Sequence, residues 1–123
     1  KMKRIRGCLG LKGFTGVDCN GMSEGLALFW HENLLVDILD KDERYINVVV
    51  SLHADAEPWR VTFLYGENCQ LMWRKLQSLY TTSDLPWLVI GDFNECLWDF
   101  EHLPTTPRPE IQMTAFHDVL EVC

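Results

Sequence analysis

The sequence predicts an α/β fold in which a mostly antiparallel β-sheet packs against helices. Residues 25–65 contain short runs rich in β-branched and aromatic side chains, which is typical of strands. Residues 68–80 and 109–123 repeat apolar side chains every three or four positions, which is typical of amphipathic helices. The 123 residues suffice for one small domain, 1–123. We expect its sheet to be incomplete at both edges, because no strand follows the last helix.

The first part of the chain predicts a helix end and three short strands. Ile5 and Leu9 lie four residues apart with basic residues between them, so residues 1–10 predict the end of a helix that Gly10 caps. Strands are expected next within 13–21, at 25–30 and at 34–39. The polar break after residue 30 predicts that the last two form a hairpin. Residues 40–43 predict a solvated turn.

The clearest strand patterns lie in residues 45–53 and 59–65. Alternate side chains of a strand point to opposite faces of the sheet. In the first run one face is apolar: Ile46, Val48, Val50 and Leu52. The opposite face is mixed and includes Asn47 and His53. In the second run one face carries Val61, Phe63 and Tyr65, and we expect the two strands to pair across the turn at 54–58.

The period then changes to that of a helix. Asn68 is a suitable N-cap for a helix of about 13 residues. Its inward face is predicted to carry Met72, Leu76, Leu79 and Tyr80. A buried strand is expected at 86–90, followed by an irregular loop at 102–109. Pro109 suits the start of a last helix, whose predicted inward side chains are Met113, Phe116, Val119 and Leu120.

Charge and cysteine content restrict the classes of function. The net charge is −7, five of the eleven basic residues lie within residues 1–12, and residues 84–123 carry eight acids and one base. A protein that binds nucleic acid by itself usually has a basic face, so we expect a metal ion or another part of a larger protein to offset this acidity. Five cysteines without a C-x-x-C pair disfavour a zinc site. With no apolar run of membrane-spanning length and no secretory signal, we expect a nuclear or cytoplasmic protein, not a secreted one.

The stretch LPWLVIGDFNE, residues 85–95, delivers polar groups directly after an apolar strand. If the chain stays extended, Asp92 and Asn94 project on the same side. A carboxylate there can orient a water or help to hold Mg²⁺, which prefers oxygen ligands, and an amide can donate a hydrogen bond to a phosphate oxygen. Gly91 allows backbone or substrate to approach closely. By spacing alone, a strand that ends in a polar turn is the better explanation of these residues.

Four segments, GLALFW, WRVTFLYGE, LPWLVIGDFNE and RPEIQMTAFHDVLEVC, occur in this order along the chain. Together they resemble the endonuclease domain of plant LINE-type (non-LTR) retrotransposons, in the DNase I-like endonuclease/exonuclease/phosphatase superfamily. The resemblance implies a partial DNase I-like α/β sandwich and Mg²⁺-dependent hydrolysis of DNA phosphodiesters, with Mn²⁺ as an alternative ion. It also implies a reverse transcriptase domain as the partner in a longer parent polyprotein.

The resemblance assigns roles to three residues. Asp92 would position the attacking water or the metal ion, Asn94 would contact the scissile phosphate, and Tyr65, followed by Gly66, would contact the phosphate from the preceding strand. The family's metal-ligand Glu and general-base His have no counterpart in this chain, so we expect it to be nearly inactive alone. Two alternatives stay open: a non-catalytic retrotransposon remnant or interaction piece, and a superfamily phosphoesterase that acts on small substrates.

Overall fold

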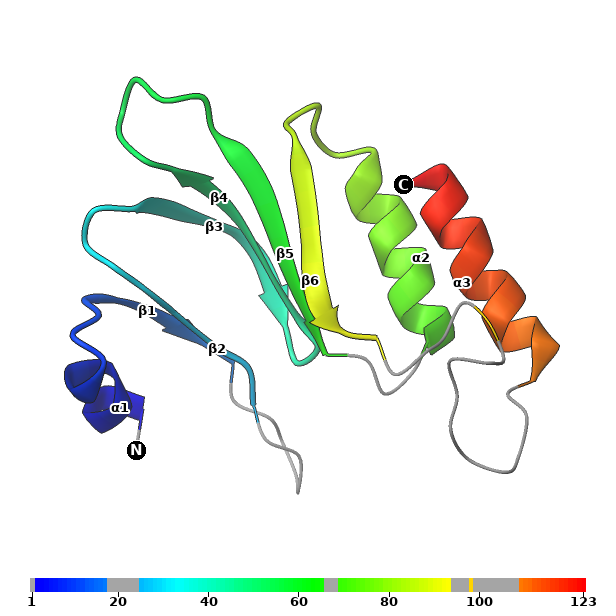
Figure 1. Ribbon diagram of the computed structural model, residues 1–123, viewed down its shortest axis with the longest axis horizontal. Coiled ribbons are helices and arrows are strands. Elements are labelled where there is room, and N and C mark those ends of the chain that lie inside the picture. Colours follow the sequence, from blue (N-terminus) through cyan, green and yellow to red (C-terminus); the bar gives the residue numbers. More distant parts are fainter. Residues whose placement is uncertain (1, 18–24, 66–68, 94–97, 99–108) are drawn as a thin grey trace. The chain divides into compact units, whose positions relative to one another are not determined.

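The computed structural model describes residues 2–17, 25–65, 69–93, 98 and 109–123 (Figure 1). It is a mixed α/β structure with antiparallel strands and helices, as predicted. Its elements are α1 (Met2–Cys8), β1 (Gly13–Gly16), β2 (Ala27–Trp30), β3 (Leu35–Asp42), β4 (Tyr45–Ser51), β5 (Trp59–Tyr65), α2 (Cys69–Tyr80), β6 (Trp87–Asp92) and α3 (Glu110–Val122). The chain divides into two compact units, Lys1–Tyr65 with Leu85–Gly91, and Gly66–Asp84 with Asp92–Cys123. The prediction of a single domain stays a prediction.

The strands of the first unit form two sheets. β1 pairs with β2, and the larger sheet has the order β3-β4-β5-β6. The β1–β2, β3–β4 and β4–β5 pairs are antiparallel. β6 runs parallel to β5: Arg60 N donates to Pro86 O at 2.8 Å near the start of both strands, and Leu64 lies against Gly91 near their ends. The prediction of a mostly antiparallel sheet is therefore confirmed.

The predicted hairpin between 25–30 and 34–39 is wrong. β2 pairs with β1, and β3 pairs with β4 from Leu35 opposite Ser51 to Asp42 opposite Tyr45. The apolar runs of β2 and β3 lie in different sheets and are not paired with each other. Both runs nevertheless supply side chains to the same core. β3 also extends three residues into the predicted turn at 40–43, so the turn itself lies at residues 43–44.

The core of the first unit lies on one face of β4 and β5. Ile46 and Val48 are 1% and 0% exposed, and Val50 and Val61 complete the buried cluster. Partly buried apolar side chains from both sheets pack against it: Val17, Leu26, Leu28, Leu34, Val36 and Phe63. The apolar alternation of 45–53 thus predicted the core face correctly, except for Leu52, which is 66% exposed because β4 ends at Ser51.

The opposite face of β4 and β5 is also buried, and it includes polar side chains. Asn47 and Thr62 are direct neighbours across the strands. Thr62 Oγ1 donates to Asn47 Oδ1 at 2.9 Å, and Trp87 Nε1 of β6 donates to Thr62 Oγ1 at 2.9 Å. The Arg60 guanidinium lies 4.2 Å from the centre of the Trp87 ring, and burial lowers the pKa of this group. Three strands are thereby connected through polar side chains.

The second unit contains α2 and α3, which lie side by side (Figure 1). Trp73 of α2 stacks on Phe116 of α3 at 4.9 Å between ring centres and on Phe93 at 6.0 Å. Met72, Leu76, Leu79, Phe116 and Val119 are buried as predicted. The inward placement of Tyr80 and Leu120 is wrong, because these side chains are 47% and 52% exposed. The proposed N-cap Asn68 lies outside the described residues.

Candidate functional site

Tyr65 is the last residue of β5. Its backbone N–H donates to Arg44 O at 2.8 Å, which fixes the end of β5 against the turn between β3 and β4. The side chain is 40% exposed, and its hydroxyl makes no hydrogen bond within the described part of the chain. An exposed phenol on a fixed strand end can donate a hydrogen bond to an external acceptor such as a phosphate oxygen.

Asp92 is the last residue of β6, and its side chain is exposed. The strand that delivers it is closely packed at Gly91, where a Cβ atom would lie 2.2 Å from Leu64 O of β5. The expectation that Gly91 permits a close approach is therefore confirmed for the protein's own backbone. Glycine here is explained by strand packing, without reference to a substrate.

β5 and β6 are parallel neighbours, so both strands end at the same edge of the sheet. In α/β sheets, ligands commonly bind beyond the carboxyl ends of such strands. Asn94 and Gly66 lie outside the described residues. The roles of Tyr65, Asp92 and Asn94, and the placement of their side chains in one site, stay predictions.

Asp92 is chemically suited to Mg²⁺ as one ligand of several. Mg²⁺ in proteins is commonly held by one or two carboxylates, with waters and substrate phosphates completing six oxygen ligands. Within the described ranges there is no group of three or more His, Cys, Asp or Glu side chains placed to hold a metal ion. Asp92 is therefore suited to supply one carboxylate of such a site.

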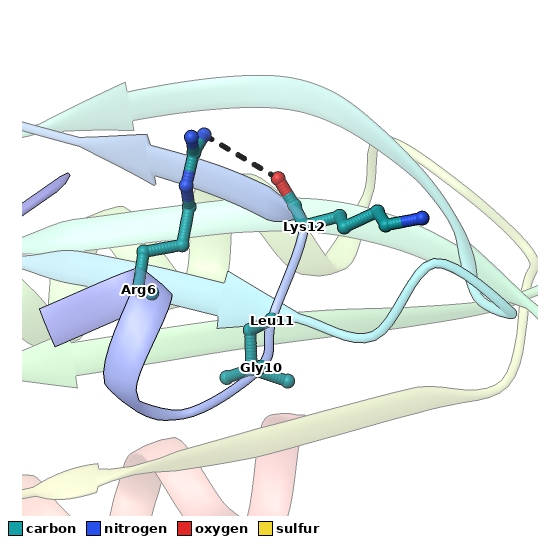
Figure 2. Close-up of a pocket in the computed structure, with 5 residues that line it drawn as sticks. Arg6, Gly10, Leu11 and Lys12 are labelled. Atoms are coloured by element: carbon teal, nitrogen blue, oxygen red, sulfur yellow. Dashed lines mark hydrogen bonds between the residues drawn. The ribbon is translucent and has the colours of Figure 1, made fainter. Parts of the chain in front are cut away.

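An open pocket of about 510 Å³ lies where α1 leads into β1 (Figure 2). It is lined by Arg6, Gly7, Gly10, Leu11 and Lys12. Gly10 adopts φ 66°, and Leu11 N donates to Arg6 O at 3.2 Å, so glycine caps the helix as predicted. Arg6 Nη1 donates to Lys12 O at 3.5 Å, and the Lys12 ammonium pairs with Glu32. Each of these two cations thus has a partner within the chain, and the lining contains no His, Asp, Glu, Ser or Cys side chain that could act as a general base or nucleophile.

Sequence reasoning missed Arg44 and the buried polar side chains of β4 and β5. Arg44 was not assigned to an element from the sequence, because the turn was expected at 40–43 and the next strand from residue 45. With the turn at 43–44, Arg44 lies opposite Tyr65. For Asn47 and Thr62 the signal was present, since the mixed face of 45–53 places Asn47 within a strand, but no pattern indicated that this face is buried.

No family model matches the chain, and comparison with curated proteins gives no match. The family suggested by the four sequence segments therefore stays a prediction. In the part of the chain that the structure describes, no helix is long and apolar enough to cross a lipid bilayer.

Proposed function

We propose that the chain is a DNase I-like domain of the retrotransposon endonuclease type, which takes part in Mg²⁺-dependent hydrolysis of DNA phosphodiesters. The observation that carries the proposal is the exposed Tyr65 at the end of β5, whose backbone is fixed by the hydrogen bond from its N–H to Arg44 O. Asp92, the last residue of β6, also has an exposed side chain. Tyr65 and Asp92 are two of the three residues to which the sequence resemblance assigns a role, and their action on one phosphate is part of the proposal.

In the proposed reaction, water adds to phosphorus and the P–O3′ bond breaks, which leaves a 3′ hydroxyl and a 5′ phosphate. Tyr65 donates its phenolic hydrogen bond to a non-bridging oxygen, and Asn94 donates its amide to the same phosphate. Asp92 orients the water or supplies one carboxylate to the ion. Mg²⁺, when bound, would neutralise charge on the phosphate as it develops, which offsets the acidity of the chain.

Binding of a short fluorescently labelled DNA duplex, with Mg²⁺ and with EDTA, tests the proposal. Mg²⁺ is expected to tighten binding by the wild type but not by Asp92→Asn. The matched control is Asp55→Asn, which removes the same charge from an exposed position in the turn between β4 and β5. If Mg²⁺ changes none of the affinities, or tightens binding by Asp92→Asn as much as by the wild type, the proposal is wrong.

Turnover separates the proposal from its alternatives. Nicking of supercoiled plasmid is expected to stay near background, because general-base catalysis contributes about 10²–10⁴ in rate and no residue of the chain matches the family's general base. Faster turnover of an inositol phosphate or a nucleotide than of DNA would favour the small-substrate alternative. Absence of both Mg²⁺ and DNA binding would favour a non-catalytic remnant.

A further inference from the structure

Arg44 lies directly opposite Tyr65, next to the last residue pair of β4 and β5. Tyr45 is paired with Leu64, so residues 44 and 65 are the next positions along the two antiparallel strands. The hydrogen bond from Tyr65 N to Arg44 O, 2.8 Å long, shows that the pairing with β5 extends to Arg44, one residue before the start of β4. Opposite residues of antiparallel strands have Cβ atoms about 5 Å apart and project to the same face.

The turn that carries Arg44 is itself fixed. Arg44 N donates to Asp42 Oδ1 at 2.9 Å, an arrangement typical of an Asx turn. Together with the bond to Tyr65 N, this gives the backbone of residue 44 two hydrogen bonds, one through its N–H and one through its carbonyl. A side chain on such a backbone is better positioned for binding than one on a long loop.

The Arg44 guanidinium is available, unlike the other cations near the sheets. Lys12 pairs with Glu32, and Lys41 donates to Thr15 Oγ1 at 3.0 Å and to Gly16 O at 2.9 Å. Arg60 is buried against Trp87. The Arg44 guanidinium has no hydrogen bond or ion pair within the described part of the chain, and the side chain is half-buried. Its planar fork of donors matches the oxygens of a phosphate.

We propose that Arg44 and Tyr65 together form an anion-binding pair that holds a phosphodiester of the substrate at this edge of the sheet. The inference rests on the proposed function for the identity of the ligand. Arg44 supplies the positive charge and a bidentate contact, and Tyr65 supplies one neutral donor. The pair thus places a cation at the sheet edge of a chain whose net charge is −7, where a polyanionic substrate would otherwise be repelled.

The carboxylates of the turn, Asp42 and Glu43, are next to Arg44 in sequence. Asp42 accepts the backbone N–H of Arg44 through Oδ1 and does not form an ion pair with the guanidinium. Glu43 has an interaction of its own within the chain. These acids reduce the local positive potential, so we expect the pair to bind phosphate through directed hydrogen bonds more than through long-range attraction.

An NMR titration of the wild-type chain with a small phosphodiester, thymidylyl-thymidine, tests the inference without a requirement for catalysis or variants. The Arg44 side-chain Nε–H signal and the Tyr65 amide signal are expected to shift together and to saturate. The matched control is the Nε–H signal of Arg74, an exposed arginine on α2. If the Arg44 signal does not shift, or shifts no more than that of Arg74, the inference is overturned.

Duplex DNA binding by variants adds an independent test. Arg44→Ala is expected to weaken binding about tenfold and to lower the dependence of affinity on salt by about one ion. Arg44→Lys should restore the salt dependence but only part of the affinity, and Arg74→Ala should change either quantity much less. Equal effects of Arg44→Ala and Arg74→Ala would contradict the pair.

The two proposals fail separately. Saturable shifts at Arg44 and Tyr65, combined with DNA binding that ignores Mg²⁺ and Asp92→Asn, would support the anion-binding pair and overturn the nuclease function. Mg²⁺-dependent DNA binding that requires Asp92, with no response at Arg44, would support the nuclease function and overturn the pair.

Discussion

The middle and the end of the β4–β5 pair have opposite characters. In the middle, Ile46 and Val48 are fully buried on one face, and Asn47 and Thr62 are buried and hydrogen-bonded on the other. At the end, Tyr65 is 40% exposed, and neither its hydroxyl nor the Arg44 guanidinium bonds to any described residue. The same two strands thus stabilise the fold along their length and leave polar groups available where they end.

This difference predicts that stability and ligand binding can be changed separately. Substitutions in the middle of the pair should lower the free energy of unfolding, whereas substitutions at its end should change phosphate binding with little effect on folding. Substitutions at both places test this contrast, from the one expected to lower the free energy of unfolding most to the one expected to lower it least.

Truncation of the core should give the largest loss. Ile46→Ala is expected to lower the free energy of unfolding by about 3 kcal/mol, within the range of about 2–5 kcal/mol for buried Ile to Ala, because Ile46 is 1% exposed. Urea denaturation followed by circular dichroism measures the change. Ile38→Ala on β3, where the side chain is 39% exposed, is the matched control and should cost less than half as much; equal losses would contradict the burial contrast.

A side chain at Gly91 should separate β5 from β6. Gly91→Ala is expected to cost about 2–3 kcal/mol, since its Cβ would meet Leu64 O at 2.2 Å and the backbone must move. The same denaturation experiment applies. Gly7→Ala in α1, where a Cβ meets nothing within 4 Å, should instead stabilise slightly, by about 0.5–1 kcal/mol. A neutral Gly91→Ala would show that the two strands are not so closely packed.

The buried polar connection should contribute less than the core. Thr62→Val keeps the shape but removes the hydroxyl that donates to Asn47 and accepts from Trp87, and should cost about 1–3 kcal/mol because buried partners are left unsatisfied. Thr114→Val, at an exposed position of α3, is the control and should change stability by less than about 0.5 kcal/mol. A loss no larger than that of the control would mean that the connection does not stabilise the sheet.

The strand end should show the reverse behaviour. Tyr65→Phe is expected to change the free energy of unfolding by less than about 0.5 kcal/mol, because its hydroxyl has no described partner. It should nevertheless weaken binding of the small phosphodiester severalfold, as measured by NMR titration. A large loss of stability without a loss of binding would assign Tyr65 to the fold and remove it from the site.

The sequence predicted the middle of the β4–β5 pair better than its end. Strong alternation in 45–53 and 59–65 specified β4, β5 and their core face, since burial on one side fixes the pattern. The partner of β2 was mispredicted because an apolar run is compatible with pairing in a sheet or with packing across two sheets. Tyr65 and Asp92 were proposed from segments that resemble a known family, and their roles stay predictions. Arg44 was not proposed from the sequence, because the role inferred for it depends on which residue of another strand lies opposite, which no local pattern encodes.

The most direct test of the central claim, that the end of β6 handles a divalent ion and a phosphate, is a Mn²⁺ titration of the isotope-labelled chain followed by NMR. Paramagnetic broadening depends on distance from the ion, so it locates the ion without any catalysis. The amide signals of Gly91, Asp92 and Tyr65 are predicted to broaden first at substoichiometric Mn²⁺, and Asp92→Asn is predicted to abolish this selectivity. Broadening centred elsewhere, or unchanged in Asp92→Asn, would contradict the claim.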